Sequence, residues 1–266
     1  MSKTIIYIQC RTGSTRFPGK ILSEVKGKPY LERLFKRIRS TNNVDEVVII
    51  TTDLVEDNVI EDICLKIKAP FFRGNQNDLL DRHYKANQIF KGDYVAKVPS
   101  DCPFSDPDIN QNVISVIKSS SYIEYASNYH PPTFPDGLDI EVVKSSILEE
   151  AWLQAKDDHE REHTFPYIWD NPERFNIFNL TNKLGNMFQT HRWTLDYKED
   201  LEFVKAIYNE FNEDEAFFFR DILEIIQKKP EISQLNANYN GINWYRNVPN
   251  KLKTIDKSLY KSQKES

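Results

Sequence analysis

The first half of the chain alternates between two kinds of apolar pattern, and this alternation restricts the possible folds more than any other feature. Residues 47–52 form a β-branched run, which is typical of a strand buried on both faces. Helical spacing follows at 56–67, where Ile60, Ile63 and Ile67 recur on one face. The same reasoning predicts strands at 5–9, 71–72 and 94–98, and helices at 29–39, 78–90 and 106–118. Strands and helices in this order predict an α/β fold, with a mostly parallel central sheet and helices on both faces.

The pattern changes after residue 120. Strands are predicted at 122–128 and 138–143, on either side of a proline-rich turn. Further predictions are a strand at 191–195 and helices at 145–156, 160–170, 197–210 and 215–228. From Pro230 onward the chain is polar and rich in Asn and Lys. We therefore predict one domain over residues 1–228, with a small inserted lobe at about 129–190, followed by an irregular C-terminal extension over residues 229–266.

Composition excludes several classes of protein. With 39% hydrophobic and 28% charged residues, the chain is too apolar for disorder and too interrupted by charge for a membrane span. A net charge of −5 argues against general nucleic-acid binding. The three cysteines have no CxxC spacing, so neither a disulfide framework nor a zinc site is indicated. The first residues run directly into a strand pattern instead of a signal peptide, and we expect a cytoplasmic protein with no membrane partner.

A short cationic loop, residues 9–20 (QCRTGSTRFPGK), directly follows the first predicted strand. Ligands of parallel sheets bind outside the carboxyl ends of the strands, where this loop must lie. Arg11, Arg16 and Lys20 bring three positive charges to it, and Gly13 and Gly19 allow the backbone to approach a ligand closely. This combination suits the triphosphate of a nucleotide.

Two familiar phosphate-binding motifs do not fit the cationic loop. A P-loop has four residues between its glycines and then Lys-Ser or Lys-Thr, whereas five residues separate Gly13 from Gly19 and Ile21 follows Lys20. The dinucleotide fingerprint GxGxxG is absent. A solvated basic turn is the alternative interpretation.

The cationic loop resembles the opening motif of the cytidylyltransferases that activate acidic sugars. Its likeness is greatest to the spore-coat-polysaccharide branch, where the loop is similar to Gln-Ala-Arg-Met-Gly-Ser-Thr-Arg-Leu-Pro-Gly-Lys; this chain departs at Cys10, Thr12 and Phe17. Further blocks resemble the branch in the same order: Phe72-Arg73-Gly74, Asp78-Leu79-Leu80-Asp81-Arg82, Asp101-Cys102-Pro103, Tyr125-Ala126-Ser127-Asn128, Pro135 to Glu141, Arg161-Glu162-His163 and Arg192 to Tyr197. Together the blocks span about residues 4–228.

The resemblance implies a Rossmann-like nucleotidyltransferase fold and transfer of CMP from CTP to an acidic sugar, with Mg²⁺ as cofactor and pyrophosphate as product. It also implies a homodimer formed through residues 129–190. Arg11 and Lys20 would be the catalytic residues, because they would hold the triphosphate and stabilise charge as pyrophosphate leaves. The nucleotide-binding set implied in this way is Gln9, Arg11, Gly13, Ser14, Arg16, Lys20, Arg73, Gly74, Asp81 and Ser100.

Two aspartates that follow strand patterns are the predicted Mg²⁺ ligands. Asp101 comes just past the strand at 94–98, and Asp196 lies at a predicted strand-to-helix junction. Mg²⁺ favours one or two carboxylates together with phosphate oxygens and water. The resemblance assigns metal-binding aspartates to both places. The alternative is a helix cap or turn at each position.

The predicted acceptor-binding residues lie later in the chain. Asp139 and Glu141 share one face of a strand because they are two residues apart, and Asp136 is close by. His163 and Arg192 are candidates for holding the carboxylate or hydroxyls of the acceptor. Solvated edge residues, and a purely structural histidine, are the alternatives.

Two other functions remain open. A glycosyltransferase of similar fold would carry an Asp-x-Asp metal motif, and the strict match is Asp106-Pro107-Asp108, which is better explained as a helix cap. A non-catalytic nucleotide-binding homologue would lack the charges needed for catalysis. The complete set of Arg11, Arg16, Lys20, Asp101 and Asp196 argues against it.

Overall fold

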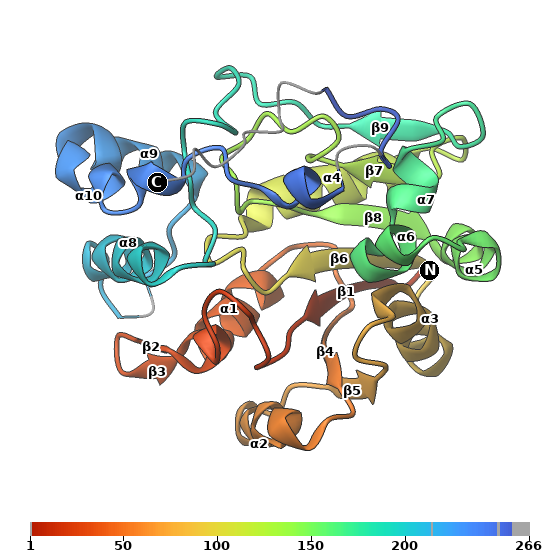
Figure 1. Ribbon diagram of the computed structural model, residues 1–266, viewed down its shortest axis with the longest axis horizontal. Helices are drawn as coiled ribbons and strands as arrows, with labels where there is room; N and C mark the ends of the chain where they lie inside the picture. Colours follow the sequence, from red (N-terminus) through yellow and green to blue (C-terminus); the bar gives the residue numbers. More distant parts are fainter. Residues whose placement is uncertain (1, 214, 249–250, 257–266) are drawn as a thin grey trace.

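The computed structural model describes residues 2–213, 215–248 and 251–256 (Figure 1). A central sheet runs through the molecule, and a two-stranded ribbon lies beside it. The strands are β1 (Thr4–Gln9), β2 (Glu24–Val25), β3 (Lys28–Pro29), β4 (Glu46–Thr52), β5 (Phe71–Gly74), β6 (Tyr94–Pro99), β7 (Tyr125–Ser127), β8 (Glu141–Lys144) and β9 (Ile177–Asn179).

Helices connect these strands. The α-helices are α1 (Tyr30–Arg39), α2 (Asn58–Ile67), α3 (Leu79–Phe90), α4 (Pro107–Ser119), α5 (Ser145–Gln154), α6 (Asp158–His163), α7 (Pro166–Trp169), α8 (Lys198–Asn209), α9 (Phe219–Lys228) and α10 (Pro230–Gln234). Short 3-10 helices are η1 (Lys20–Leu22), η2 (Val55–Asp57), η3 (Ala237–Tyr239) and η4 (Trp244–Asn247). Across the described residues, no helix combines the length and apolar content needed to cross a bilayer.

The central sheet has the strand order β5-β4-β1-β6-β8-β7-β9. Strands β5, β4, β1 and β6 are mutually parallel, whereas β8 runs antiparallel to both of its neighbours. β9 extends the far edge parallel to β7. The predicted mostly parallel sheet is therefore confirmed, and the carboxyl ends of β1, β4 and β6 meet at one edge.

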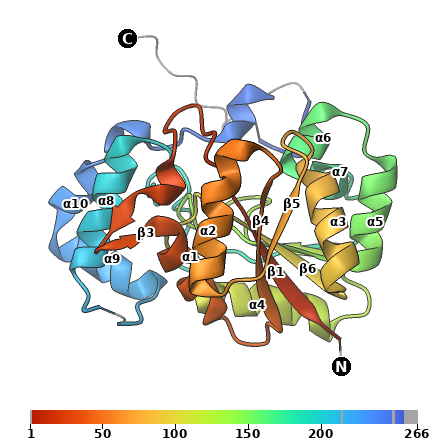
Figure 2. The ribbon, with the colours of Figure 1, turned by 90° about the horizontal axis from the view of Figure 1, so that it is seen from below.

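Alternating side chains of β1 divide the core into two layers. Ile6 and Ile8 pack with α1, α2 and α4, whereas Ile5 and Tyr7 pack with α3 and α5. Figure 2 shows these helix sets on either side of the strands. This arrangement confirms the prediction of helices on both faces and explains why the strands of the first half read as continuous apolar runs.

In the second half of the chain one predicted strand is wrong and one observed strand was missed. Residues 191–195 form no strand; a single bridge joins Arg192 to Asp136. The backbone amides of Trp193 and Leu195 instead donate to the carbonyls of Asp136 and Asp101 (2.7 and 2.8 Å), so the segment links two loops. The edge strand β9 was not predicted, because three partly buried residues carry too little periodicity.

The boundaries predicted beyond the first half also change. Residues 129–190, predicted as an inserted lobe, contribute β8 and β9 to the central sheet, so much of this range belongs to the main sheet. The extension after residue 228 is not irregular where it is described, since it contains α10, η3 and η4 and buries Tyr245 completely. Ile232 and Tyr245 belong to the two layers of the core, so this part of the chain packs into the predicted domain and does not extend away from it.

Candidate active site

The cationic loop leaves β1 at the carboxyl edge of the sheet and closes on itself. The backbone amide of Gly19 donates to the carbonyl of Thr12 (2.9 Å), and Gly19 has a φ of 69°, which favours glycine. Asp57 fixes the loop from outside, because one carboxylate oxygen accepts from both the amide (2.8 Å) and the hydroxyl (2.6 Å) of Thr12. Burial would raise the pKa of Asp57, but hydrogen bonds from Thr12 and Thr52 outweigh it and lower that pKa.

Lys20 lies at the centre of a cluster of charges from three parts of the chain. Its side-chain nitrogen is 2.8 Å from Asp196 Oδ1, 3.8 Å from Asp101 Oδ2 and 2.7 Å from the carbonyl oxygen of Leu195. Arg16 contacts the other oxygen of Asp196 at 2.7 Å. The cationic loop and the two predicted metal ligands therefore share one site.

The two aspartates of this cluster respond differently to it. Burial raises the pKa of Asp101, and the neighbouring Lys20 offsets this only in part. Burial would also raise the pKa of Asp196, but Lys20 and Arg16 together outweigh it and lower that pKa. Asp196 is therefore the carboxylate that the cationic loop holds ionised.

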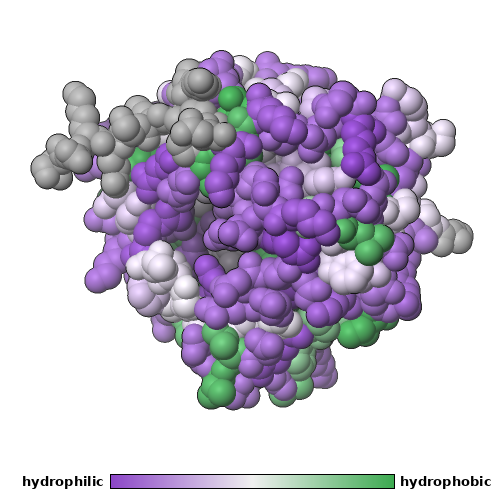
Figure 3. Space-filling view, turned by 45° about the vertical axis from the view of Figure 1, so that its right-hand side comes forward, coloured by the Kyte–Doolittle hydropathy of each residue, from purple (hydrophilic) through white to green (hydrophobic). Residues whose placement is uncertain are grey.

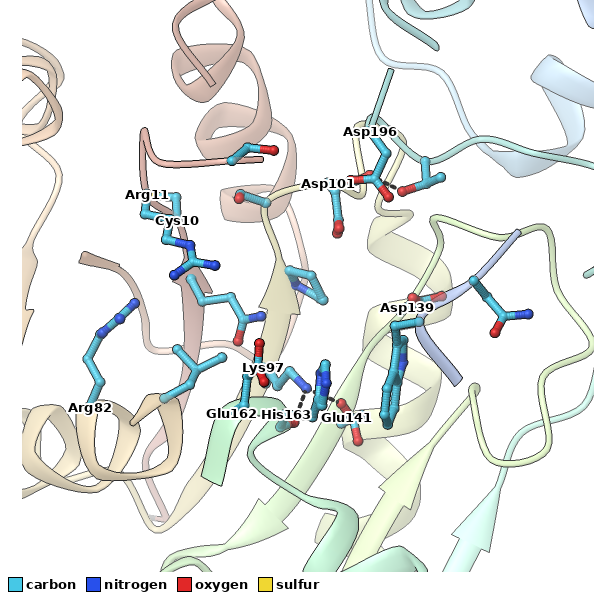
Figure 4. A pocket seen from close by; sticks show the side chains of 18 of the residues that line it. Cys10, Arg11, Arg82, Lys97, Asp101, Asp139, Glu141, Glu162, His163 and Asp196 are labelled. Carbon is cyan, nitrogen blue, oxygen red and sulfur yellow. Dashed lines mark hydrogen bonds and ion pairs between the residues drawn. The ribbon is translucent and has the colours of Figure 1, made fainter. Parts of the chain in front are cut away.

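This cluster lines a pocket of about 760 Å³ at the edge of the sheet. In Figure 4, Arg11 and Arg82 lie on one side, Asp139 and Glu141 on the other, and Asp101 and Asp196 between and above them. The predicted site residues that line the pocket are Gln9, Arg11, Ser14, Arg16, Lys20, Ser100, Asp101, Asp136, Asp139, Glu141, His163 and Asp196. Sequence positions 9 to 196 are thus brought to one cavity.

A buried ion pair forms the floor of the pocket on the Asp139 side. Lys97 Nζ lies 2.6 Å from Glu141 Oε2 and also donates to the carbonyl of His163 (2.8 Å). The hydroxyl of Tyr125 donates to the other oxygen of Glu141 (2.7 Å). Burial would raise the pKa of Glu141, but Lys97 and His130 outweigh this effect and lower that pKa. Both carboxylate oxygens of Glu141, a predicted substrate ligand, therefore already have partners within the protein.

Asp136 and Asp139 line the same side of the pocket and differ in their partners. Burial raises the pKa of Asp136 to about 7, although Arg192 lies 3.5 Å away. Burial, and then repulsion from Asp136, raise the pKa of Asp139 well above its usual range. Asp139 makes no side-chain hydrogen bond or ion pair to any residue that the structure describes, so its oxygens are available to a ligand.

Gly137 lets the loop that carries these aspartates approach the Asp196 segment. Its φ is 108°, and a Cβ atom here would lie 2.5 Å from the backbone nitrogen of Thr194. A side chain at this position would push the two segments apart. The close packing explains how Asp136 and Asp196 reach the same cavity.

Five predicted site residues are not among the residues that line the pocket, so the geometry does not support a direct role for them. Arg192 is 2% exposed and forms a two-bonded ion pair (2.8 and 3.0 Å) with Asp200, which lies in the first turn of α8. Arg73 is paired with Glu61 (2.8 Å) on the outer side of β5. The remaining three are Gly13, Gly74 and Asp81.

Each of these three residues has a different structural setting. Gly74 leaves room for Arg82, since a Cβ atom would lie 3.2 Å from Arg82 Cγ. Asp81 accepts from the indole of Trp152 (2.9 Å) and pairs with Lys85 (2.8 Å), on the side of α3 that faces α5. Gly13 is exposed within the cationic loop, between pocket residues.

Several pocket residues were not predicted. Arg82 lies on α3 and Lys97 on β6, and both line the pocket. In the sequence, Arg82 has the pattern of a surface charge on a helix and Lys97 that of an ordinary strand residue. The aromatic side chains Tyr129, Trp169 and Trp244 also line the cavity. Trp244 lies beyond the predicted domain, so no sequence signal pointed to it.

The Asp106-Pro107-Asp108 motif is a helix cap, as predicted. Asp106 accepts from the backbone amides of Asp108 (2.9 Å) and Ile109 (3.0 Å) at the start of α4. It also accepts from the amide of Phe219 (2.6 Å). Its carboxylate is therefore fully used and lies outside the pocket, which argues against the glycosyltransferase alternative.

Comparison with known proteins identifies the family. A family model described as cytidylyltransferase matches residues 5–244. The chain belongs to the cytidylyltransferase family. This cytidylyltransferase is 33% identical to a solved cytidylyltransferase from Leptospira borgpetersenii serovar Hardjo-bovis, with a TM-score of 0.84 over 88% of this chain and 98% of that one.

Two further proteins are similar to this cytidylyltransferase. The spore coat polysaccharide biosynthesis protein SpsF of Bacillus subtilis is 29% identical over 237 residues, which cover 87% of this chain and 97% of that protein. A solved CMP:2-keto-3-deoxy-manno-octonic acid synthetase complexed with CTP has a TM-score of 0.60 at 17% identity, over 79% of this chain and 99% of that one. The latter shows a shared fold, which confirms the predicted Rossmann-like nucleotidyltransferase architecture.

Proposed function

We propose that this cytidylyltransferase transfers CMP from CTP to an acidic sugar and releases pyrophosphate. The observation that carries the proposal is the position of Lys20, between Asp101 and Asp196 in one polar pocket. The solved synthetase of the same fold is described as complexed with CTP, and its name specifies a sugar acid. SpsF is named for a surface polysaccharide, which supports a sugar acceptor.

The triphosphate of CTP would bind the cationic loop. Arg11 is exposed, lines the pocket and forms no side-chain ion pair or hydrogen bond with the described residues, so its charge is available to a ligand. Lys20 and Arg16, in contrast, both pair with Asp196. Binding of the triphosphate would therefore exchange these carboxylate contacts for phosphate contacts, so that both cations keep an anionic partner.

The donor set fits a Mg²⁺ ion. Asp101 and Asp196 both line the pocket, and the ammonium group of Lys20 lies between them. Once Lys20 turns to the phosphates, the two carboxylates would be free to hold a divalent cation. Bound Mg²⁺ would neutralise phosphate charge and acidify the acceptor hydroxyl. Asp101, with 34% of its side chain exposed, is the more open of the two ligands.

The transfer itself asks the chain mainly for position and charge. The acceptor oxygen forms a bond to the α-phosphorus while the bond to the bridging oxygen of the β-phosphate breaks, and the hydroxyl proton passes to solvent. Lys20 and Arg11 stabilise the charge that grows on the departing pyrophosphate. Asp139 orients the acceptor by accepting hydrogen bonds from its hydroxyls.

A pyrophosphate-release assay tests the proposal. Each of the four ribonucleoside triphosphates would be combined with 3-deoxy-manno-octulosonate, N-acetylneuraminate and glucuronate, with Mg²⁺ present. We expect release only with CTP and at least one sugar, and loss of release in EDTA that excess Mg²⁺ reverses. Release from CTP without a sugar, or full activity in EDTA, would contradict the proposal.

A further inference from the structure

The C-terminal segment, residues 236–248 and 251–256, is fastened to the body of the molecule at both ends. At its start, the Asn236 amide donates to Asp200 (2.9 Å), and Arg192 donates to the carbonyl of Ile242 (3.0 Å). At its end, Asp170 accepts from the backbone amides of Lys253 and Thr254, at 2.8 and 2.7 Å. Buried groups with this many partners hold the segment in one place.

Between these anchors the segment contributes a wall of the pocket. Tyr245 is fully buried, and its hydroxyl lies 3.1 Å from His130 Nδ1. The neighbouring Trp244 is only partly buried and lines the pocket, with its indole stacked on the His163 ring at 3.8 Å between centroids. Trp169 stacks on His130 in the same way, at 3.9 Å. The result is an aromatic wall beside Asp139.

The charges on this side of the pocket are already satisfied. Lys97 is paired with Glu141, and Arg192 is paired with Asp200 outside the cavity. Burial lowers the pKa of His163 to about 3, so this ring is neutral at neutral pH. Among the described residues that line this side, no unpaired cation is left for a carboxylate. Arg11, which makes no side-chain ion pair or hydrogen bond with the described residues, lies across the pocket (Figure 4).

We propose that the C-terminal segment forms the acceptor-binding wall, and that Trp244 packs against the uncharged, hydroxyl-bearing end of the acceptor sugar. Aromatic rings bury the C–H faces of a sugar, while a carboxylate such as Asp139 accepts from its hydroxyls. The carboxylate of an acidic acceptor then points toward the cationic loop instead of toward His163 and Arg192, as the sequence suggested. This inference rests on the proposed function and specifies how its second substrate is held.

The test compares Trp244→Ala and Trp244→Phe in the full chain. The assay follows pyrophosphate release from CTP, with whichever of 3-deoxy-manno-octulosonate, N-acetylneuraminate and glucuronate reacts fastest with the wild type. We expect Trp244→Ala to raise KM for the sugar about tenfold or more while KM for CTP changes less than about twofold, because the indole contacts one substrate only. Trp244→Phe keeps an aromatic face, and its KM for the sugar should stay within about threefold of the wild type.

Trp152→Ala is the matched control, because Trp152 is a partly buried tryptophan stacked on Tyr84 (4.1 Å) outside the pocket. The same rise in sugar KM in this control would overturn the inference, as would an unchanged sugar KM, or an equal rise for both substrates, in Trp244→Ala. A wild type that binds CTP in a thermal-shift assay but releases pyrophosphate with none of the three acidic sugars refutes the proposed function instead, and the inference with it.

Discussion

Lys20 illustrates how much of the site depends on one side chain. It is 7% exposed, yet it contacts Asp196 and lies near Asp101, which come from different loops. A buried ammonium with these partners holds the two aspartates in place. The same ammonium is the preorganised positive charge that the proposed reaction requires at the phosphates.

The first prediction concerns this charge. Lys20→Ala should reduce kcat on the order of 100-fold, because one preorganised donor to the transition state is lost. Steady-state pyrophosphate release measures the effect, and circular dichroism checks that the variant folds. Lys85→Ala, which removes an exposed lysine of α3 outside the pocket, should retain wild-type turnover. Near-normal kcat in Lys20→Ala would remove the cationic loop from the mechanism.

The second prediction follows from the partly buried ring of His163. Its pKa is lowered from 6.5 to about 3, so between these values the unfolded chain binds a proton that the folded chain does not. Stability is therefore full above pH 6.5 and is lost as pH falls toward 3. His163→Phe keeps a ring against Trp244 but removes this titration. Between pH 7 and pH 5 its unfolding free energy should fall less than that of the wild type, by up to about 2 kcal/mol.

Urea denaturation at the two pH values measures this difference. All other titrating groups are common to both proteins, so their contributions cancel in the comparison. Equal losses of stability in wild type and variant would show that His163 titrates normally.

The position of a residue in the pocket was predictable where a charged or polar side chain follows the end of a strand. It was less predictable where an ion-pair partner elsewhere in the chain decides whether the side chain reaches the pocket. The cationic loop, Asp101 and Asp196 reach the pocket as predicted. Arg192 does not, because Asp200 takes its guanidinium, and a sequence does not show which charges satisfy one another. For the same reason Lys97, whose partner Glu141 lies 44 residues away, was missed.

At the scale of elements, α4 shows a cap with an additional function. The carboxylate of Asp106 binds the first turn of α4 and also the amide of Phe219 at the start of α9. One buried side chain thus joins two helices that are far apart in sequence.

The third prediction is that Asp106→Ala destabilises the fold by about 2 kcal/mol or more, above the usual cost of a lost helix cap, because the Phe219 amide also loses its partner. Urea unfolding of the variant measures this. Asp108→Ala, an exposed position in the same turn, is the control and should change stability by less than about 0.5 kcal/mol. Equal stability of the two variants would contradict the assigned double role of Asp106.

Elements were predictable when their signal is local. β1, β4 and β6 are long apolar runs, and their helices carry a clear period, so they were found. The segment at 191–195 looks like a strand, but its amides bond to the loops at Asp101 and Asp136. Such pairing over long separations is absent from any local pattern.

At the scale of the whole molecule, the outer surface is largely hydrophilic on the face drawn in Figure 3, with hydrophobic residues scattered over it. Among the exposed hydrophobic side chains, Leu153 and Leu184 are 52% and 53% exposed and lie within residues 129–190. This is the range through which dimerisation was predicted. The homodimer remains a proposal.

The fourth prediction is a dimer in solution, with twice the 31.3 kDa mass of one chain. Leu184→Asp should weaken it, since burying an unpaired charge at an interface is costly. Leu65→Asp, at an exposed leucine outside the range, should not. Sedimentation velocity measures both, and a wild type that sediments as a 31.3 kDa monomer at all concentrations contradicts the prediction.

The aromatic wall of the pocket has a consequence for how the protein is made. The segment that carries Trp244 is held on one side by the amide of Tyr245, which donates to Asn243, and further along by the amide of Thr254, which donates to Asp170. The ribosome must therefore release residues up to Thr254 before this wall of the cavity is fastened at both ends. A nascent chain can assemble the parallel strands and the cationic loop earlier, because both come from the first hundred residues, but the aromatic wall closes only after residue 254 has emerged.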